Sequence, residues 1–184
     1  VATALLYPVL RRTMIWFVDA VVLHRPDYRT LRATVAHVAQ ESDEVEPLLS
    51  SVCDHMTTAL NAAFVTWRPW MAVTQDNLGV AVMTGADAVN AVDALAGEPL
   101  VGPPAACVTV PTTDQPPFVF VIGQLSGGRR LLSDDLATLE SIAVVVARRI
   151  DAIRITNERY NREIREQEIG KLASEAELRA LRAQ

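Results

Sequence analysis

Hydrophobic residues recur at alternating spacings of three and four along the last fifty positions of the chain. The pattern runs from Leu136 to Leu181, contains no proline and meets a helix-breaking residue only at Gly170. Such spacing lines one face of a helix, and a run of this length is typical of a coiled coil. At about 1.5 Å per residue the helix would extend roughly 70 Å, more than a small domain needs. We therefore expect one long helix that leaves its domain and pairs with a second helix.

Polar residues within this pattern predict how the helices pair. Asn157 follows Ile153 on the apolar face, and a lone buried asparagine fixes register and favours a two-stranded parallel pair. From Gln167 to Ser174 the face turns polar, while a rival apolar line begins at Ile169. We consider two interpretations, a rotational switch between the two lines and a weak coiled coil that frays. The predicted dimer seam consists of Ile150, Ile153, Asn157, Tyr160, Ile164, Leu178 and Leu181.

Three helices are predicted ahead of residue 61. Residues 13–23 are apolar nearly all round, and residues 27–40 place their apolar side chains on one stripe. A third helix follows, with Asp43 and Glu46 spaced for its start and Pro47 tolerable only in its first turn. The chain therefore opens with a helical segment.

Beyond Asn61 the pattern changes to short β-branched or aromatic runs separated by turn residues. This is the signature of neighbouring strands in one sheet. Residues 84–106 are rich in Ala, Gly, Pro and Asp, and we interpret them as a loop with a short helix at 88–95. The predicted strands cover residues 64–67, 80–83, 107–110 and 118–125.

Composition narrows the range of partners. The 184 residues include 17 basic and 22 acidic side chains, for a formal net charge of -5, so nucleic acid is not an expected partner. Cys53 and Cys107 are expected to be buried free thiols in a reducing compartment. His24, His37 and His55 are spaced too widely for a local metal motif. No metal site is predicted and no cofactor is identified.

The carboxylate pairs of the chain are explained by helix capping. Residues 134–135 and 43–44 both stand where a helix is predicted to begin, and the helix dipole favours acids there. Ser50 and Cys53 lack a base and an orienting acid assembled around them in the sequence. We therefore predict no enzymatic activity.

One segment allows a comparison with a known family. Residues Phe118 to Leu125, followed by Arg130 to Leu136, form a predicted strand, turn and helix start. With the preceding order of helix, short strands and small-residue loop, this resembles a GAF domain, a sensory module related to PAS domains. The resemblance implies an α+β fold, an antiparallel sheet with flanking helices. The expected parts are an N-terminal helical linker (1–42), a GAF-like sensory domain (43–150) and a C-terminal signalling helix (151–184).

The tail extends the resemblance. Residues Glu175 to Gln184 are similar to the lead-in of LytS-like sensor histidine kinases, in which the same helix continues to the phospho-accepting histidine. This implies the input module of a dimeric bacterial two-component kinase whose catalytic half acts on a response regulator. Charges interrupt the apolar stretch from Ala4 to Leu23, so it cannot span a membrane by itself. Arg11 and Arg12 suit the cytoplasmic flank of an upstream membrane helix, and the alternative is a helix buried in a bundle.

The same resemblance implies a small-molecule pocket between the sheet and residues 84–106. Trp67, Cys107, Thr109 and Gln124 are the candidate lining residues, chosen by strand position and polarity. Two functions stay open: sensing with relay to a cytoplasmic kinase region of a membrane-anchored parent, and a structural dimerisation spacer without a ligand. A cavity with converging polar groups would favour sensing, and a filled interior would favour the spacer.

Overall fold

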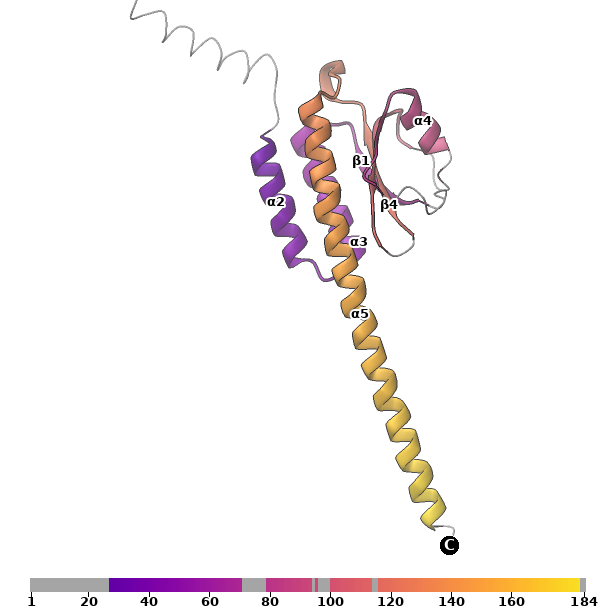
Figure 1. Ribbon diagram of the computed structural model, residues 1–184. Coiled ribbons are helices and arrows are strands. Elements are labelled where there is room, and N and C mark those ends of the chain that lie inside the picture. The colour runs from indigo at the N-terminus through magenta and orange to yellow at the C-terminus, as the bar shows by residue number, and fades with distance from the viewer. Residues whose placement is uncertain (1–26, 71–78, 94, 96–99, 114–115, 183–184) are drawn as a thin grey trace, which may run out of the picture.

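The computed structural model describes residues 27–70, 79–93, 95, 100–113 and 116–182, with side chains described as far as Lys171. Within these residues the chain is α+β, as predicted. A sheet lies between a layer of three helices and a single short helix (Figure 1). The elements are α2 (Tyr28–Glu41), α3 (Val45–Leu60), β1 (Val65–Pro69), β2 (Val82–Thr84), α4 (Ala86–Asp93), β3 (Pro104–Val110), β4 (Phe118–Gly123) and α5 (Ser133–Arg182).

The described sheet has four antiparallel strands in the order β1-β4-β3-β2. Trp67 of β1 and Val108 of β3 both stand opposite Phe120 of β4, so these three side chains share one face. Every residue of β4 is buried, because β4 lies inside the sheet and both of its faces are covered. Its unbroken apolar sequence, FVFVIG, suits such a position.

The larger core lies between the sheet and the layer formed by α2, α3 and α5. Phe120 and Ile122 meet Leu48, Leu49 and Met56 of α3 there, all of them fully buried. Helix α2 adds further residues to this same core, namely Leu31, Val35 and Ala39. The described part of the segment predicted as a linker, residues 27–42, therefore packs on the core of the domain.

Helix α2 begins where the sequence predicts, and α3 begins differently. Asp27 caps α2, since its side chain accepts hydrogen bonds from the backbone N–H groups of Arg29 and Thr30. The hydrogen bond from the Thr30 hydroxyl, followed by that from its backbone, lowers the pKa of Asp27. Asp43 was expected to start the third helix, but the cap position is Glu44, without a side-chain cap hydrogen bond.

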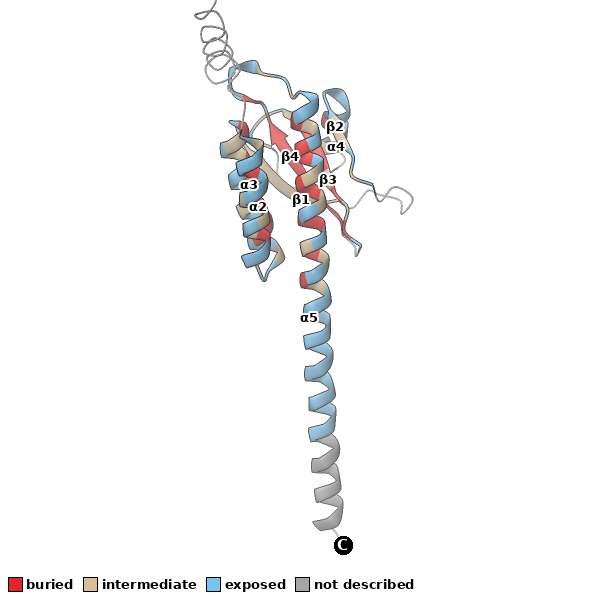
Figure 2. Ribbon diagram, turned by 60° about the vertical axis from the view of Figure 1, so that its left-hand side comes forward, coloured by how far each residue is buried: buried red, intermediate tan, exposed pale blue. Residues whose placement is uncertain are grey.

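The predicted long helix is present as α5, a single helix of 50 residues. Its first part packs on the core, and its remainder extends away from the domain into solvent (Figure 2). None of the described helices combines the length and apolarity needed to cross a membrane. The helix predicted at residues 13–23 and the apolar stretch from Ala4 to Leu23 lie outside the described residues.

Candidate functional site

The four predicted pocket residues do not come together. Cys107 is fully buried on the face of the sheet that α4 covers, where it packs with Val119 and Val121 beneath Ala88 and Ala91. Its thiol lies 3.6 Å from the Ala88 carbonyl oxygen. Burial raises the pKa of this thiol to about 11, so Cys107 is a protonated core residue rather than a reactive one.

Thr109 shares the α4 side of β3 and serves the sheet itself. Its hydroxyl oxygen accepts a hydrogen bond from the backbone N–H of Ala81 at 2.7 Å and lies 3.2 Å from the carbonyl oxygen of Gly79. These contacts hold the approach to β2 against β3. The Thr109 hydroxyl, which suggested a ligand contact, is therefore already hydrogen-bonded to backbone groups.

Trp67 and Gln124 lie elsewhere. The Trp67 ring packs on the helical face, 5.7 Å from the Phe118 ring in an edge-on arrangement, and its indole N–H donates to the Ser50 hydroxyl at 3.2 Å. Gln124 follows the end of β4 with an exposed side chain, and its backbone carbonyl accepts from Ala63 N–H. The prediction that these four residues line one pocket is wrong, since Trp67 and Cys107 lie on opposite faces of the sheet.

The predicted dimer seam divides into two parts. Ile150 and Ile153 are 0% and 4% exposed within their own domain, which leaves them no surface for a second helix. Their placement on the seam is wrong, because the stripe they belong to is covered by the chain's own core. Asn157, Tyr160 and Ile164 are exposed on the projecting part of α5. Leu178 and Leu181 belong to α5, but their side chains lie outside the described set.

Polar contacts gather where α5 leaves the domain. Arg149 donates two hydrogen bonds to the Ser42 carbonyl oxygen, at 3.1 and 2.6 Å, and lies 3.3 Å from the Asp43 carboxylate. Because Asp43 is 95% exposed, the hydrogen bonds to Ser42 contribute more than the ion pair. Arg149 thus fastens the turn between α2 and α3 to α5.

Two and five residues farther along, α5 fastens the connection between β3 and β4. The Asp151 carboxylate accepts hydrogen bonds from the backbone N–H and the hydroxyl of Thr113, the latter at 2.8 Å. Arg154 donates to the Pro116 carbonyl oxygen at 3.2 Å, and its guanidinium lies 5.3 Å from the centre of the Phe118 ring. We call Arg149, Asp151 and Arg154 with these partners the exit clamp.

The exit clamp is the arrangement that sequence reasoning missed. Both of its arginines donate to backbone carbonyls, and carbonyls have no sequence signature. Only the charges at 149, 151 and 154 are visible in the sequence, within a helix that is rich in charge throughout. The clamp can hold α5 in a fixed position, because it joins the α2–α3 turn and the β3–β4 connection, both at one end of the domain, to this single helix.

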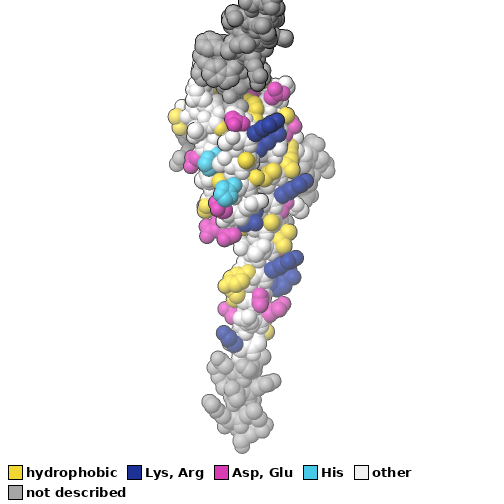
Figure 3. All heavy atoms as spheres, turned by 90° about the vertical axis from the view of Figure 1, so that its left-hand side faces the viewer, with side chains coloured by type: hydrophobic (Ala, Val, Ile, Leu, Met, Phe, Trp, Pro, Cys, Tyr) yellow, Lys and Arg dark blue, Asp and Glu magenta, His cyan; other side chains and the backbone are white. Residues whose placement is uncertain are grey.

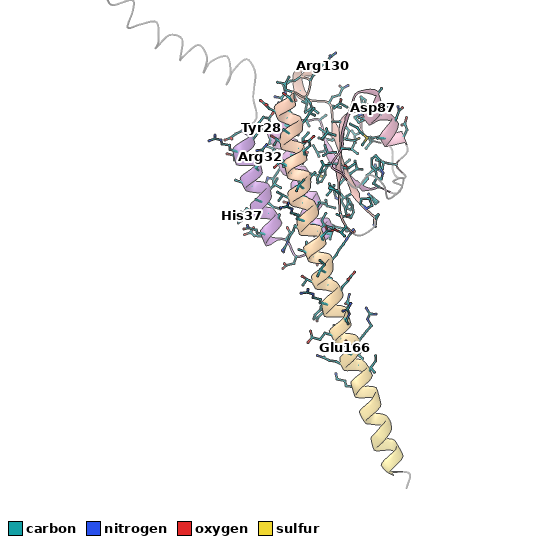
Figure 4. The ribbon with its side chains drawn as sticks, viewed as in Figure 1. Tyr28, Arg32, His37, Asp87, Arg130 and Glu166 are labelled. Carbon is teal, nitrogen blue, oxygen red and sulfur yellow. The ribbon has the colours of Figure 1, made fainter. Side chains whose placement is uncertain are left out.

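The acidic pair in the first turn of α5 also has a structural role. Asp135 is 1% exposed, accepts a hydrogen bond from Leu132 N–H at 2.7 Å and lies 3.5 Å from Arg129. It fastens the incoming loop to the first turn of α5, which agrees with the predicted role of acids at this helix start. Nearby, Arg32 of α2, labelled in Figure 4, donates to the Thr138 hydroxyl at 3.0 Å and joins α2 to α5.

The described histidines stand on the helical layer. His37 lies 3.5 Å from Glu41 on the exposed side of α2, and His55 borders a shallow groove of about 280 Å³ between α2 and α3. The other groove residues are Asp27, Thr30, Leu31, Thr34, Thr58 and Ala59. Over the part of the chain that the structure describes, His, Cys, Asp and Glu side chains form no group of three that could hold a metal ion.

Comparisons with known proteins leave the family open. No protein-family model matches this sequence, and no curated protein matches it.

Proposed function

We propose that this chain is a relay module of a dimeric sensor histidine kinase, in which α5 conveys movement of the domain to a kinase region that follows it. The observation that supports this most is the sharing of α5. The helix is part of the domain core as far as Ile153 and continues without interruption to Arg182. A rigid element that belongs to two regions couples their positions.

The exit clamp gives this relay a physical route. One loop from the helices and one from the sheet, both at the same end of the domain, bind α5 within six residues, at Arg149, Asp151 and Arg154. A shift of the β3–β4 connection changes the Asp151 and Arg154 contacts, and the helix must tilt or turn to keep them. When two copies of α5 are paired, such a tilt or turn changes the position of the two kinase regions relative to each other.

A second function, the structural dimerisation spacer, is favoured by a different observation. Cys107, Val119 and Val121 are each 0% exposed on the α4 face, where a ligand was expected. The described part of that face is therefore filled by the chain's own side chains. In the relay proposal the input consequently reaches the domain through another surface or through the segment before α2.

A fusion to the catalytic region of a LytS-type histidine kinase separates the two functions. The full chain, joined in frame at Gln184, is compared with Arg149→Ala by autophosphorylation rate and by sedimentation. The relay predicts that Arg149→Ala changes the rate while the dimer persists, because the clamp positions α5 without holding the copies together. Arg130→Ala, which removes an exposed loop arginine, is the matched control and is expected to leave the rate unchanged.

The other outcomes are equally informative. An unchanged rate in Arg149→Ala, with an intact dimer, supports the passive spacer. A chain that stays monomeric contradicts both functions.

A further inference from the structure

The outward side of the helical layer carries no patch of one chemical kind. Acidic, basic, histidine and apolar side chains are mixed on the side of the molecule that Figure 3 shows. That side therefore does not indicate a partner. The contacts beneath it indicate where a movement of the helical layer is transmitted.

Strand β4 lies between the two strands on which α3 and α5 pack. Helix α3 packs on β1, α5 packs on β3, and β4 is hydrogen-bonded to both of these strands. Phe118 is the first residue of β4 and is 7% exposed. It stands opposite Pro69 of β1 and Val110 of β3. The Phe118 ring is therefore placed where side chains from both sides of the helical layer can reach it.

Trp67 joins this ring to α3. Trp67 stands opposite Phe120 in the β1–β4 ladder, so Phe118 is its diagonal neighbour on the same face of the sheet. The centroids of the Trp67 and Phe118 rings are 5.7 Å apart and the ring planes differ by 79°, an edge-to-face arrangement that aromatic pairs prefer. The Trp67 indole N–H also donates to the hydroxyl of Ser50 in α3 at 3.2 Å. A shift of α3 along the sheet therefore changes this hydrogen bond and moves the indole.

Arg154 joins the same ring to α5. Its guanidinium carbon lies over the Phe118 ring, 5.3 Å from the centroid, and its side chain donates to the Pro116 carbonyl oxygen at 3.2 Å. A cation is attracted to the face of an aromatic ring, so this contact depends on the tilt of the ring. A tilt of Phe118 that follows Trp67 therefore changes how Arg154 holds α5.

We infer that Phe118 couples α3 to the exit of α5: displacement of α3 moves Trp67, Trp67 tilts Phe118, and Phe118 shifts Arg154. This inference rests on the proposed relay and names the route by which a movement of the helical layer reaches the exit clamp. The layer of α2 and α3 then acts on α5 at two points, at Arg149 through the Ser42 carbonyl and at Arg154 through Phe118.

Indole N–H signals in nuclear magnetic resonance spectra of the full chain test this coupling. The chain has three tryptophans, and the signal lost in Trp67→Phe is that of Trp67. Arg154→Gln removes the charge over the Phe118 ring and is expected to shift the Trp67 signal. Arg148→Gln removes an equal charge from an exposed position of the same helix and is expected to leave the signal in place.

The same substitution is then made without the aromatic ring. In a Phe118→Leu background, Arg154→Gln is expected to leave the Trp67 signal where Phe118→Leu alone puts it, because leucine offers no ring face to the guanidinium. An unmoved Trp67 signal in Arg154→Gln overturns the inference, and so does a shift of equal size in the Phe118→Leu background. The first comparison needs no change in the core, so it decides even where Phe118→Leu fails to fold.

The fusion to a LytS-type catalytic region separates this route from the relay itself. Ser50→Ala removes the hydroxyl that accepts from Trp67, and Ser51→Ala makes the same change one residue along α3. A lost hydrogen bond is expected to change the autophosphorylation rate by about twofold or more in Ser50→Ala, and Ser51→Ala is expected to keep the parent rate. A rate altered by Arg149→Ala but not by Ser50→Ala overturns the inference and leaves the relay standing. A rate altered by none of these substitutions contradicts the proposed function, while the Trp67 signal still decides whether Phe118 couples the two helices.

Discussion

The two halves of α5 have similar sequence patterns and opposite surroundings. In the upper half, residues 133–153, apolar positions at spacings of three and four are buried against a sheet and two helices. In the lower half the same spacing continues, but residues 155–171 are all exposed. The spacing therefore describes a helix with an apolar face and does not say what covers that face. Along this one helix, the apolar face is covered by the domain as far as Ile153 and is exposed from Asn157 onward.

The largest effect that separates the halves is expected from isoleucine truncation. Ile150→Ala removes fully buried methyl groups and should lower the free energy of unfolding by about 2–5 kcal/mol. Ile164→Ala, the same change on the projecting half, should alter it by less than about 0.5 kcal/mol. Urea unfolding of dilute protein, followed by tryptophan fluorescence, measures both. Equal losses in the two variants would mean that the lower half also packs on the domain.

The exit clamp is expected to contribute less than the core. Arg149→Ala removes two hydrogen bonds from a charged donor to the Ser42 carbonyl and should cost about 1.5–3 kcal/mol. Arg148→Ala, its exposed neighbour, is the control and should leave unfolding unchanged at concentrations where the chain is monomeric. The same urea titration decides. If both variants unfold like the parent, the clamp does not stabilise the junction.

Alkaline pH should weaken the domain and leave the projecting half unaffected. Burial raises the pKa of Cys53 from 9.0 to about 12, so above pH 9 the unfolded chain releases a proton that the folded chain keeps. The Cys53 contribution to stability is therefore complete below pH 9 and falls as pH rises toward 12, by at most about 1.4 kcal/mol per pH unit. Cys107, whose pKa burial raises to about 11, adds a similar loss between pH 9 and 11. Cys53→Ala should therefore reduce the slope of the unfolding free energy against pH without abolishing it. A profile with unchanged slope would show that another group causes the loss.

The smallest effect is expected in the lower half. Nothing lies within 4 Å of a Cβ built on Gly170, so alanine fits there. Gly170→Ala should stabilise the helix locally by about 1 kcal/mol, because glycine loses more backbone entropy. Hydrogen exchange of amides near residue 170 should slow, while exchange in β4 stays the same. Slower exchange in β4 as well would indicate that the two halves unfold as one unit.

Much of the fold could be predicted because local patterns determine it. The run FVFVIG became the interior strand β4, the helix predicted at residues 27–40 became α2, and the apolar spacing became a 50-residue helix. Each depends on neighbours in sequence, and each was found within a few residues of its predicted ends. The packing of α2 into the core was not predicted, because an apolar stripe on a helix does not indicate which other element covers it.

The candidate site could not be predicted, for two physical reasons. Strand position alone does not relate the faces of two strands, since this requires their register, and the pairing of Trp67 and Val108 with Phe120 puts Cys107 on the other face. The exit clamp uses backbone carbonyls of Ser42 and Pro116, which any residue supplies. Both depend on contacts between segments far apart in the chain.

The most direct test of the account is the distance between two copies of the lower half of α5. A spin label at Gln167→Cys, an exposed position on the projecting part of α5, reports that distance by pulsed electron resonance in the full chain. The relay proposal requires two parallel copies and predicts one short distance, comparable to the width of a helix pair. A long distance, as in an antiparallel pair, or no measurable distance because the chain is monomeric, would contradict it.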